Sequence, residues 1–425
     1  MIARDKSEKT RAEAVAVSDR IAGFSYAIRN IVVEAQKVEQ AGRRVRYLNI
    51  GDPVPFGFST PPHLLEAVER AIREGHNGYG PSPGILSARE AVAADYTRKG
   101  LLLAADRVLL TSGASEGIEL SLTALVNPGE EVLVPVPTYP LYTAVLAKIG
   151  AVAVYYRLDP NRRWLPDLEH LKASTTQKAR AIVVIDPNNP TGAVYPDEIR
   201  RELLRFSEER GLVLLTDEVY AEIAFDRPVG PLASLAPKAP VISFGSLSKG
   251  YLAPGWRAGW LAVSDTKRLD PLLAAIKKLA DGRLCSPVPM QYAISAALNG
   301  GRAHQEKFVA ALRQRASFTV SRLSAIKGIS CVAPSAAFYV MPRVALPPGR
   351  TDEDYVLGLL RSKGLLCVHG SGFGTDPSAG FFRIVFLPPM AELSAAYDDL
   401  AAFTSEFLGS ASGARAQAER GAEPR

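Results

Sequence analysis

Short apolar runs alternate with longer amphipathic stretches through the middle of the chain. Each run is four to six residues long and mostly apolar, which is typical of strands buried on both faces of a parallel sheet. Segments 115–125 and 196–210, which lie between runs, have the periodicity of helices. The pattern predicts an α/β fold with helices on both faces of a mostly parallel sheet. The expected strands are Arg107–Thr111, Glu131–Pro135, Ala151–Tyr156, Arg180–Ile185, Gly211–Thr216, Val241–Phe244 and Gly259–Val263.

A second, smaller domain is expected after this sheet, because 425 residues exceed one small core. A long amphipathic stretch, Ala303–Ile326, leads out of the sheet region. Short strand candidates follow at Ile329–Val332, Phe338–Val340, Leu365–Val368 and Phe382–Phe386. We expect Arg43–Asn49 to join this α+β domain from the N-terminal side. The expected division is an N-terminal arm with a small-domain segment (1–60), a large domain (61–298), a small C-terminal domain (299–408) and a disordered, polar tail (409–425).

The composition excludes several classes of function. The net charge of +6 arises from basic residues scattered among 44 acidic ones, so we expect no nucleic-acid partner. The polar start of the chain lacks the apolar core of a secretory signal, and no apolar run approaches the roughly 20 residues that span a membrane. The three cysteines and five histidines have no ligand-like spacing, which argues against a metal site. We therefore expect a cytoplasmic protein whose chemistry depends on an organic cofactor or on carboxylate, Lys and Tyr side chains.

Five motifs follow the predicted strands directly. Because the carboxyl ends of parallel strands meet at one edge of a sheet, the motifs are expected to lie together where ligands bind in such folds. Each motif alone also has a structural interpretation, but their common position favours a shared site. They are Thr111-Ser-Gly-Ala-Ser115, Pro137-Thr-Tyr-Pro140, Asn188-Asn-Pro-Thr-Gly192, Asp217-Glu-Val-Tyr220 and Ser246-Leu-Ser-Lys249.

The last motif suits a cofactor that carries both a carbonyl and a phosphate. The Lys249 amine could form a Schiff base with the carbonyl, while Ser246, Ser248 and Arg257, eight positions later, could hold phosphate oxygens. A surface Ser/Lys turn is the alternative. In the first motif, Gly113 allows close backbone approach, and the N-terminus of the following helix suits a phosphate. A helix cap at Ser112 or Ser115 would explain the same residues.

The remaining motifs suit a flat, electron-accepting ring. Asp217 could pair with a pyridinium nitrogen and keep it protonated, and Tyr220 could donate to a phenolic oxygen. The Asn189 amide could contact the same oxygen, and Tyr139 could be an aromatic platform. The alternatives are a helix N-cap at Asp217, a simple turn at Asn189 and a buried tyrosine at position 139.

The ordered set of motifs, with Gly255-Trp-Arg-Ala-Gly259, resembles the class I/II (fold type I) pyridoxal-5′-phosphate (PLP)-dependent aminotransferases over roughly residues 25–407. The resemblance implies a large PLP domain, a smaller α+β domain and a ping-pong exchange between an amino acid and a 2-oxo acid. It makes Lys249 the Schiff-base lysine and Asp217 the pyridinium partner, with Tyr220 and Asn189 at the phenolic oxygen and Tyr139 on the ring. Gly113, Ala114, Ser115, Ser246, Ser248 and Arg257 would bind the phosphate.

The same resemblance implies residues that bind substrate and a second subunit. Arg383 would bind the α-carboxylate with two parallel hydrogen bonds, and Gly51 would contact substrate through its backbone. Tyr79 would reach the phosphate of the neighbouring subunit in a homodimer.

Several stretches, among them Leu48-Asn-Ile-Gly-Asp-Pro53 and Val368-His-Gly-Ser-Gly-Phe-Gly374, look like the alanine aminotransferase subgroup. Tyr26 and Arg29 would then fold over the substrate, and alanine/pyruvate with glutamate/2-oxoglutarate would be favoured. Ala27, Asn30 and Asp186 depart from the usual residues of the subgroup. Aspartate, aromatic or branched-chain substrates therefore stay open.

The sequence also bears on three other functions. The His369–Gly374 segment resembles a dinucleotide-binding loop, but it lacks the third glycine at the right spacing and lies late in the chain, which disfavours a nicotinamide dehydrogenase. About 25 residues precede the recognisable region, too few for a helix-turn-helix domain of a regulator. Lyase or synthase chemistry stays open, because a fold does not determine its reaction.

Overall fold

The computed structural model describes residues 17–21 and 27–420. Its helices are α1 (Ala27–Gln40), α2 (Pro62–Arg73), α3 (Leu86–Arg98), α4 (Ala114–Leu125), α5 (Pro140–Ile149), α6 (Leu168–Ser174), α7 (Asp197–Glu209), α8 (Asp270–Asp281), α9 (Val288–Asn299), α10 (Ala303–Ser324), α11 (Asp352–Lys363) and α12 (Met390–Arg420). Its strands are β1 (Arg46–Tyr47), β2 (Val108–Ser112), β3 (Glu131–Val136), β4 (Val152–Asp159), β5 (Leu165–Pro166), β6 (Ala179–Ile185), β7 (Val213–Asp217), β8 (Val241–Ser246), β9 (Ala258–Val263), β10 (Ile329–Ser330), β11 (Tyr339–Val340), β12 (Arg343–Val344), β13 (Leu365–Leu366), β14 (Val368–His369) and β15 (Phe382–Val385).

The large domain is built on an eight-stranded sheet in the order β2-β9-β8-β7-β6-β3-β4-β5. Strands β8, β7, β6, β3 and β4 pair in parallel, whereas β9 is antiparallel to both β2 and β8. Since β2 and β8 both oppose β9, β2 runs in the same direction as β8. The α/β prediction is confirmed, and the carboxyl ends of β2, β8, β7, β6 and β3 lie at one edge of the sheet. Strand β9 begins at that same edge.

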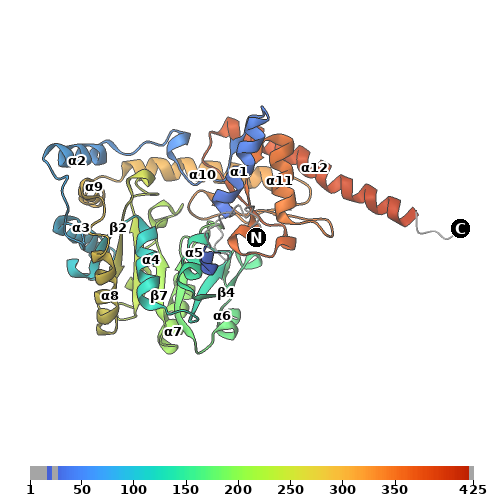
Figure 1. Cartoon of the computed structure of the whole chain (residues 1–425). Coiled ribbons are helices and arrows are strands. Elements are labelled where there is room, and N and C mark those ends of the chain that lie inside the picture. Colours follow the sequence, from blue (N-terminus) through green and yellow to red (C-terminus); the bar gives the residue numbers. More distant parts are fainter. Residues whose placement is uncertain (1–16, 22–26, 421–425) are drawn as a thin grey trace, which may run out of the picture.

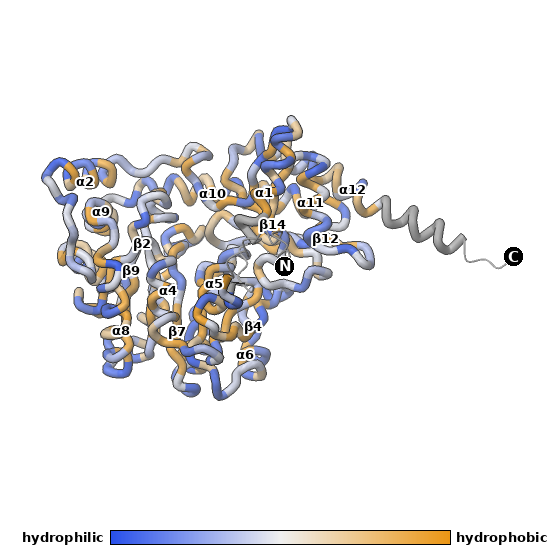
Figure 2. The backbone as a smooth tube through the Cα atoms, in the orientation of Figure 1, coloured by the Kyte–Doolittle hydropathy of each residue, from blue (hydrophilic) through white to orange (hydrophobic). Residues whose placement is uncertain are grey.

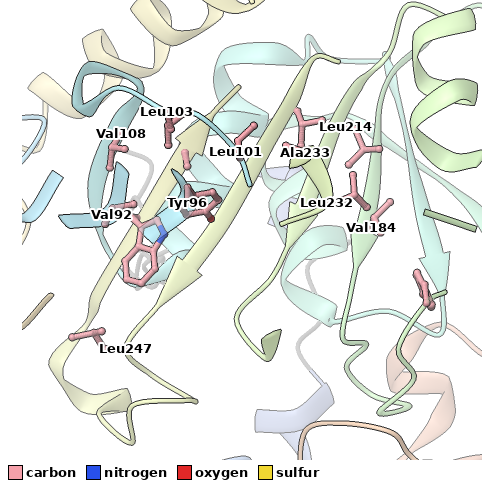
Figure 3. Packing of buried hydrophobic residues seen from close by; sticks show 14 of the residues in the cluster. Val92, Tyr96, Leu101, Leu103, Val108, Val184, Leu214, Leu232, Ala233 and Leu247 are labelled. Carbon is pink, nitrogen blue, oxygen red and sulfur yellow. The ribbon is translucent and has the colours of Figure 1, made fainter. Parts of the chain in front are cut away.

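Helices cover both faces of this sheet (Figure 1). Successive residues of one strand point to opposite faces, so Ile182 packs with α3 and α7, and Val183 packs with α4, α5 and α8. Figure 3 shows the first of these two layers, in which Tyr96 and Leu214 are buried. Hydrophobic residues are concentrated in the strands and in the helices against them (Figure 2). Burial on both faces is the physical reason that the strands read as continuous apolar runs.

The smaller domain begins with α10, which leads out of the large one (Figure 1). An antiparallel sheet in the order β11-β15-β14 packs with α11 and α12 around a separate core. Strand β1 pairs in parallel with β13, at Arg46↔Leu365 and Tyr47↔Leu366. Arg46 and Tyr47, which precede the large domain in sequence, therefore lie in the smaller domain in space.

The C-terminal helix corrects one prediction. α12 continues to Arg420 and projects from the body of the molecule (Figure 1), so a helix covers most of the segment that we predicted to be disordered. Ala, Arg, Gln and Glu dominate the segment after Ser412 and are good helix formers, and the helix is already nucleated upstream. Residues 421–425 lie outside the described part. Within the described part, no helix has both the length and the apolar character that crossing a membrane requires. A cytoplasmic location stays a prediction.

Candidate active site

A cavity of about 660 Å³ lies at the carboxyl edge of the sheet and is lined by both domains. Its size is typical of a small-molecule site. The large domain contributes residues from the ends of five strands, and the smaller domain contributes Arg383, Tyr339 and the Ile50–Asp52 segment. Of the residues singled out in the sequence, the lining includes Gly51, Ala114, Ser115, Tyr139, Asn189, Asp217, Tyr220, Ser246, Ser248, Lys249, Arg257 and Arg383.

One end of the cavity is formed by the start of α4 and the Arg257 guanidinium. Gly113 is the N-cap of α4 and has a left-handed φ of 74°. No side chain caps this helix, so the interpretation of Ser112 or Ser115 as a cap is wrong. Arg257 donates to the backbone carbonyl of Ser112 at 3.1 Å. The amides of a helix N-terminus beside a guanidinium, with Ser246 and Ser248 in the same lining, suit an anion.

Asp217 ends β7 and is a buried carboxylate in the cavity wall. Burial raises the pKa of Asp217 to about 6, against the opposing effects of the Val219 amide, the Tyr142 hydroxyl and the Lys249 charge. The Val219 amide donates to Asp217 Oδ1 at 3.3 Å, so the carboxylate also caps the local turn. Tyr142 donates to Oδ2 at 3.4 Å. These contacts orient the carboxylate, and no ion pair between Asp217 and a described side chain compensates its charge.

Lys249 follows β8 and carries a buried amine. Its Nζ donates to the backbone carbonyl of Gly51 at 2.7 Å and lies 5.6 Å from the centre of the Phe338 ring. Burial, with the nearby Arg383 and Arg257 charges, lowers the pKa of Lys249 to about 8, against the opposing effects of the Asp52 and Asp217 charges. A neutral amine, which is the nucleophilic form, is therefore accessible near neutral pH.

Arg383 and Asn189 meet although they are 194 residues apart in sequence. Arg383 Nη1 donates to Asn189 Oδ1 at 3.1 Å, and the Arg383 guanidinium also donates to the backbone carbonyl of Asn49. The neighbouring Asn188 makes the local turn instead, because its Oδ1 accepts from the Thr191 amide and hydroxyl. Asn189 is thus not needed for the turn and faces the cavity.

Tyr79 does not line this cavity. Tyr79 is 85% exposed and lies in a separate surface hollow with Cys285 and Ser286. Arg29 lies in the first turn of α1. Tyr26 lies outside the described residues.

Sequence reasoning missed three residues of the site. Tyr142, one helical turn after Tyr139, contacts Asp217, and Tyr339 contacts Tyr220. Asn49 offers its backbone carbonyl to Arg383. The three-residue spacing between Tyr139, the N-cap of α5, and Tyr142 was the only available signal, because the other two contacts join distant parts of the chain.

Residues 45–400 match the sequence profile of the family "Aminotransferase class I and II". The chain belongs to this family. It is an aminotransferase, as the motifs at the sheet edge led us to expect.

The aminotransferase is similar to proteins with related names. Glutamate-pyruvate aminotransferase AlaA of Haemophilus influenzae is 38% identical, over 92% of this chain and 98% of its own. Alanine aminotransferase of Mycobacterium tuberculosis is 38% identical, over 93% of this chain and 94% of its own. The structure of alanine aminotransferase from Pyrococcus furiosus superimposes with a TM-score of 0.89 at 38% identity, covering 92% of this chain and all of the other.

Proposed function

We propose that this aminotransferase binds PLP and exchanges amino groups between alanine and 2-oxoglutarate, or between glutamate and pyruvate. One observation carries the proposal: the buried Lys249 amine, the Asp217 carboxylate and the Arg383 guanidinium, from two domains, line a single cavity. These are the groups that hold an aldehyde, a cationic ring nitrogen and a carboxylate respectively.

The residues fit PLP for two further reasons. Asp217 is a buried carboxylate without an ion pair to a described side chain, and a protonated ring nitrogen would supply the missing positive charge. At the other end, a methyl group on Gly113 would lie 2.3 Å from Arg257 Nη2, so the backbone and the guanidinium close a cradle that only glycine permits. Ser246, Ser248 and the α4 amides would bind the phosphate there. Tyr139, Tyr220 and Asn189 would contact the ring and its phenolic oxygen.

The chemistry of the chain's own residues follows from these positions. When bound, PLP supplies an aldehyde that condenses with amines and a ring that accepts electrons from the substrate Cα. Arg383 binds the substrate α-carboxylate and so orients the Cα–H bond toward Lys249. Lys249 Nζ takes the proton from Cα, and its pKa of about 8 suits a general base near neutral pH. Between the two half-reactions the amino group would stay on the cofactor, so that the first substrate leaves as its 2-oxo acid and a second 2-oxo acid then accepts the group.

The choice of alanine and glutamate is supported by the names of the relatives, two of which are alanine aminotransferases and one a glutamate-pyruvate aminotransferase. Aspartate, aromatic or branched-chain amino acids are the alternative substrates. Tyr26 and Arg29 would close the site over the smaller substrates.

We also propose that the enzyme is a homodimer with shared sites. Tyr79 is an exposed aromatic residue in a Gly/Pro-rich loop, and it lies outside the cavity of its own chain. Such a loop could extend into a partner's cavity, and two-fold symmetry would then form two equivalent sites.

The test combines cofactor mapping with a substrate panel. Borohydride reduction and peptide mapping should locate the cofactor on Lys249, and a label on any other lysine would contradict the site. Half-reactions with each common amino acid, followed spectroscopically, should give alanine and glutamate far larger kcat/KM values than aspartate or tyrosine. A larger value for aspartate or tyrosine would refute the alanine assignment while leaving the reaction class intact.

A further inference from the structure

Tyr339 contacts two proposed functional residues at once. Its hydroxyl lies 2.8 Å from the Tyr220 hydroxyl, and the Arg383 guanidinium carbon lies 4.6 Å from the centre of its ring. Tyr339 is buried, with 2% of its surface exposed, and it lines the cavity. The large domain supplies Tyr220 and the smaller domain supplies Arg383, so Tyr339 joins the two halves of the site.

Strand pairing determines why Tyr339 lies against Arg383. Tyr339 of β11 pairs with Val385 of β15 in antiparallel register. Residues opposite each other in such a pair project to the same face, and Arg383 projects to the face of Val385 because the two are two residues apart. Tyr339 and Arg383 are therefore diagonal neighbours on one face, and the sheet holds the ring against the guanidinium. A cation over an aromatic face is stabilised, most strongly where water is excluded.

The Tyr339 hydroxyl also packs on the peptide that faces the lysine. A methyl group on Gly51 would lie 2.0 Å from the Tyr339 hydroxyl oxygen, so only glycine permits this approach. The carbonyl of the same Gly51 accepts from Lys249 Nζ at 2.7 Å. Tyr339 thus contacts Tyr220 and Arg383 directly, and it packs on Gly51, the residue that accepts the hydrogen bond from Lys249.

We propose that Tyr339 is a positioning residue that couples the substrate carboxylate site to Tyr220. Each tyrosine hydroxyl has a single hydrogen to donate. If Tyr220 donates its hydrogen to the phenolic oxygen of the cofactor, Tyr339 must donate to Tyr220. That donation makes Tyr220 a better donor, and the Tyr339 ring keeps Arg383 in place for the carboxylate. The inference rests on the proposed function, because it assumes PLP in the cavity.

Two substitutions separate the two contacts. Tyr339→Phe removes the hydroxyl and keeps the ring, whereas Tyr339→Leu removes both. Tyr355→Phe is the matched control. Tyr355 is a buried tyrosine of the smaller domain, and its hydroxyl lies 2.7 Å from the Thr404 hydroxyl. Tyr355 does not line the cavity. The readouts are the pH titration of the visible absorbance of the cofactor-loaded protein without substrate, and the KM and kcat for alanine and glutamate.

We expect Tyr339→Phe to raise the titration midpoint by about half a pH unit, because the phenolate form of the cofactor loses support from Tyr220. The shift should have the same direction as that of Tyr220→Phe and be smaller. Tyr339→Leu should in addition raise the KM of both substrates about three- to tenfold, because Arg383 loses one of the two aromatic rings against its guanidinium and keeps only that of Phe373. Tyr355→Phe should change neither quantity.

An unchanged midpoint in Tyr339→Phe, or an unchanged KM in Tyr339→Leu, would overturn this inference while the proposed function stands. Tyr339→Phe conserves the ring, so its titration decides the matter even if Tyr339→Leu does not fold. A wild-type protein that shows no titrating absorbance with PLP would overturn the proposed function, and this inference with it.

Discussion

The Arg257 guanidinium lies directly against the backbone of Gly113, so that a methyl group at Gly113 would be 2.3 Å from Arg257 Nη2. The contact joins the start of α4 to the residue that precedes β9, the antiparallel strand that begins at the ligand-binding edge. Gly113 also has a left-handed φ of 74°, which glycine adopts without strain. Two separate physical requirements therefore select glycine at this position.

Replacing Gly113 by alanine should weaken PLP binding by at least about tenfold, because the methyl group displaces Arg257 from the phosphate end of the cavity. Gly129→Ala is the matched control: Gly129 has a similar φ of 80°, but nothing lies within 4 Å of its added methyl group. Both variants should lose about 1–3 kcal/mol of stability, because an alanine at either position is held at a φ that L residues rarely adopt. Titration of apoprotein with PLP measures the difference, and equal affinities in the two variants would argue against the cradle.

Asp217→Asn should stabilise the apoprotein at high pH. The pKa of Asp217 is raised by burial to about 6 from an ordinary 3.8, so the folded state binds this proton more tightly than the unfolded state does. The contribution of Asp217 to stability is therefore greatest at low pH and falls as the pH rises through about 4 to 6. The unfolding free energy of the variant, relative to that of the wild type, should therefore increase by about 1 kcal/mol when the pH is raised from near 5 to near 8. Urea unfolding of both apoproteins measures this gain.

The same substitution should weaken PLP binding and lower the rate of Cα–H abstraction by orders of magnitude, since the ring nitrogen loses its anionic partner. Asp186→Asn is an instructive control, because Asp186 is also buried with a pKa raised to about 6 but lies 3.2 Å from Arg200. Asp186→Asn should lower the free energy of unfolding, because Arg200 loses a buried carboxylate partner. Asp217→Asn with a full rate and weaker substrate binding would mean that Asp217 is only a turn cap.

Arg383→Lys should lower kcat/KM by an amount equivalent to about 2–5 kcal/mol of transition-state free energy. An ammonium cannot reproduce the two parallel bonds of a guanidinium to a carboxylate. The loss should be similar for alanine and glutamate. Arg361→Lys, at an exposed ion pair of the smaller domain, should leave kcat/KM unchanged for both alanine and glutamate. If only dicarboxylic substrates were affected, Arg383 would instead recognise the substrate side chain.

Mixing two inactive variants should restore activity if the site is shared. Lys249→Ala and Tyr79→Ala, unfolded and refolded together, form about half mixed dimers when association is random. A Tyr79 that acts across the interface leaves one intact site in each mixed dimer, so about a quarter of wild-type activity should return. Mixed dimers that form but stay inactive, from two severely impaired parents, would exclude the shared site.

The sequence by itself determined the α/β fold and most of the cavity lining in the large domain. Strand positions were readable because burial on both faces requires continuous apolar runs, and turn chemistry marks where each run ends. Asp217 is the last residue of its strand, and Lys249, Asn189 and Gly113 each follow their own strand within a few residues. Parallel pairing then brings the motifs to one edge without further information.

Only the tertiary structure decided which distant residues meet. Asn49 reaches Arg383 because β1 pairs with β13, and Tyr339 reaches Arg383 and Tyr220 because β11 pairs with β15 and the smaller domain packs on the larger. These strands are two to four residues long, too short for a periodic pattern, and their partners are not neighbours in sequence. Contacts of this kind depend on how two separate cores pack together, a relationship that local patterns of polarity do not contain.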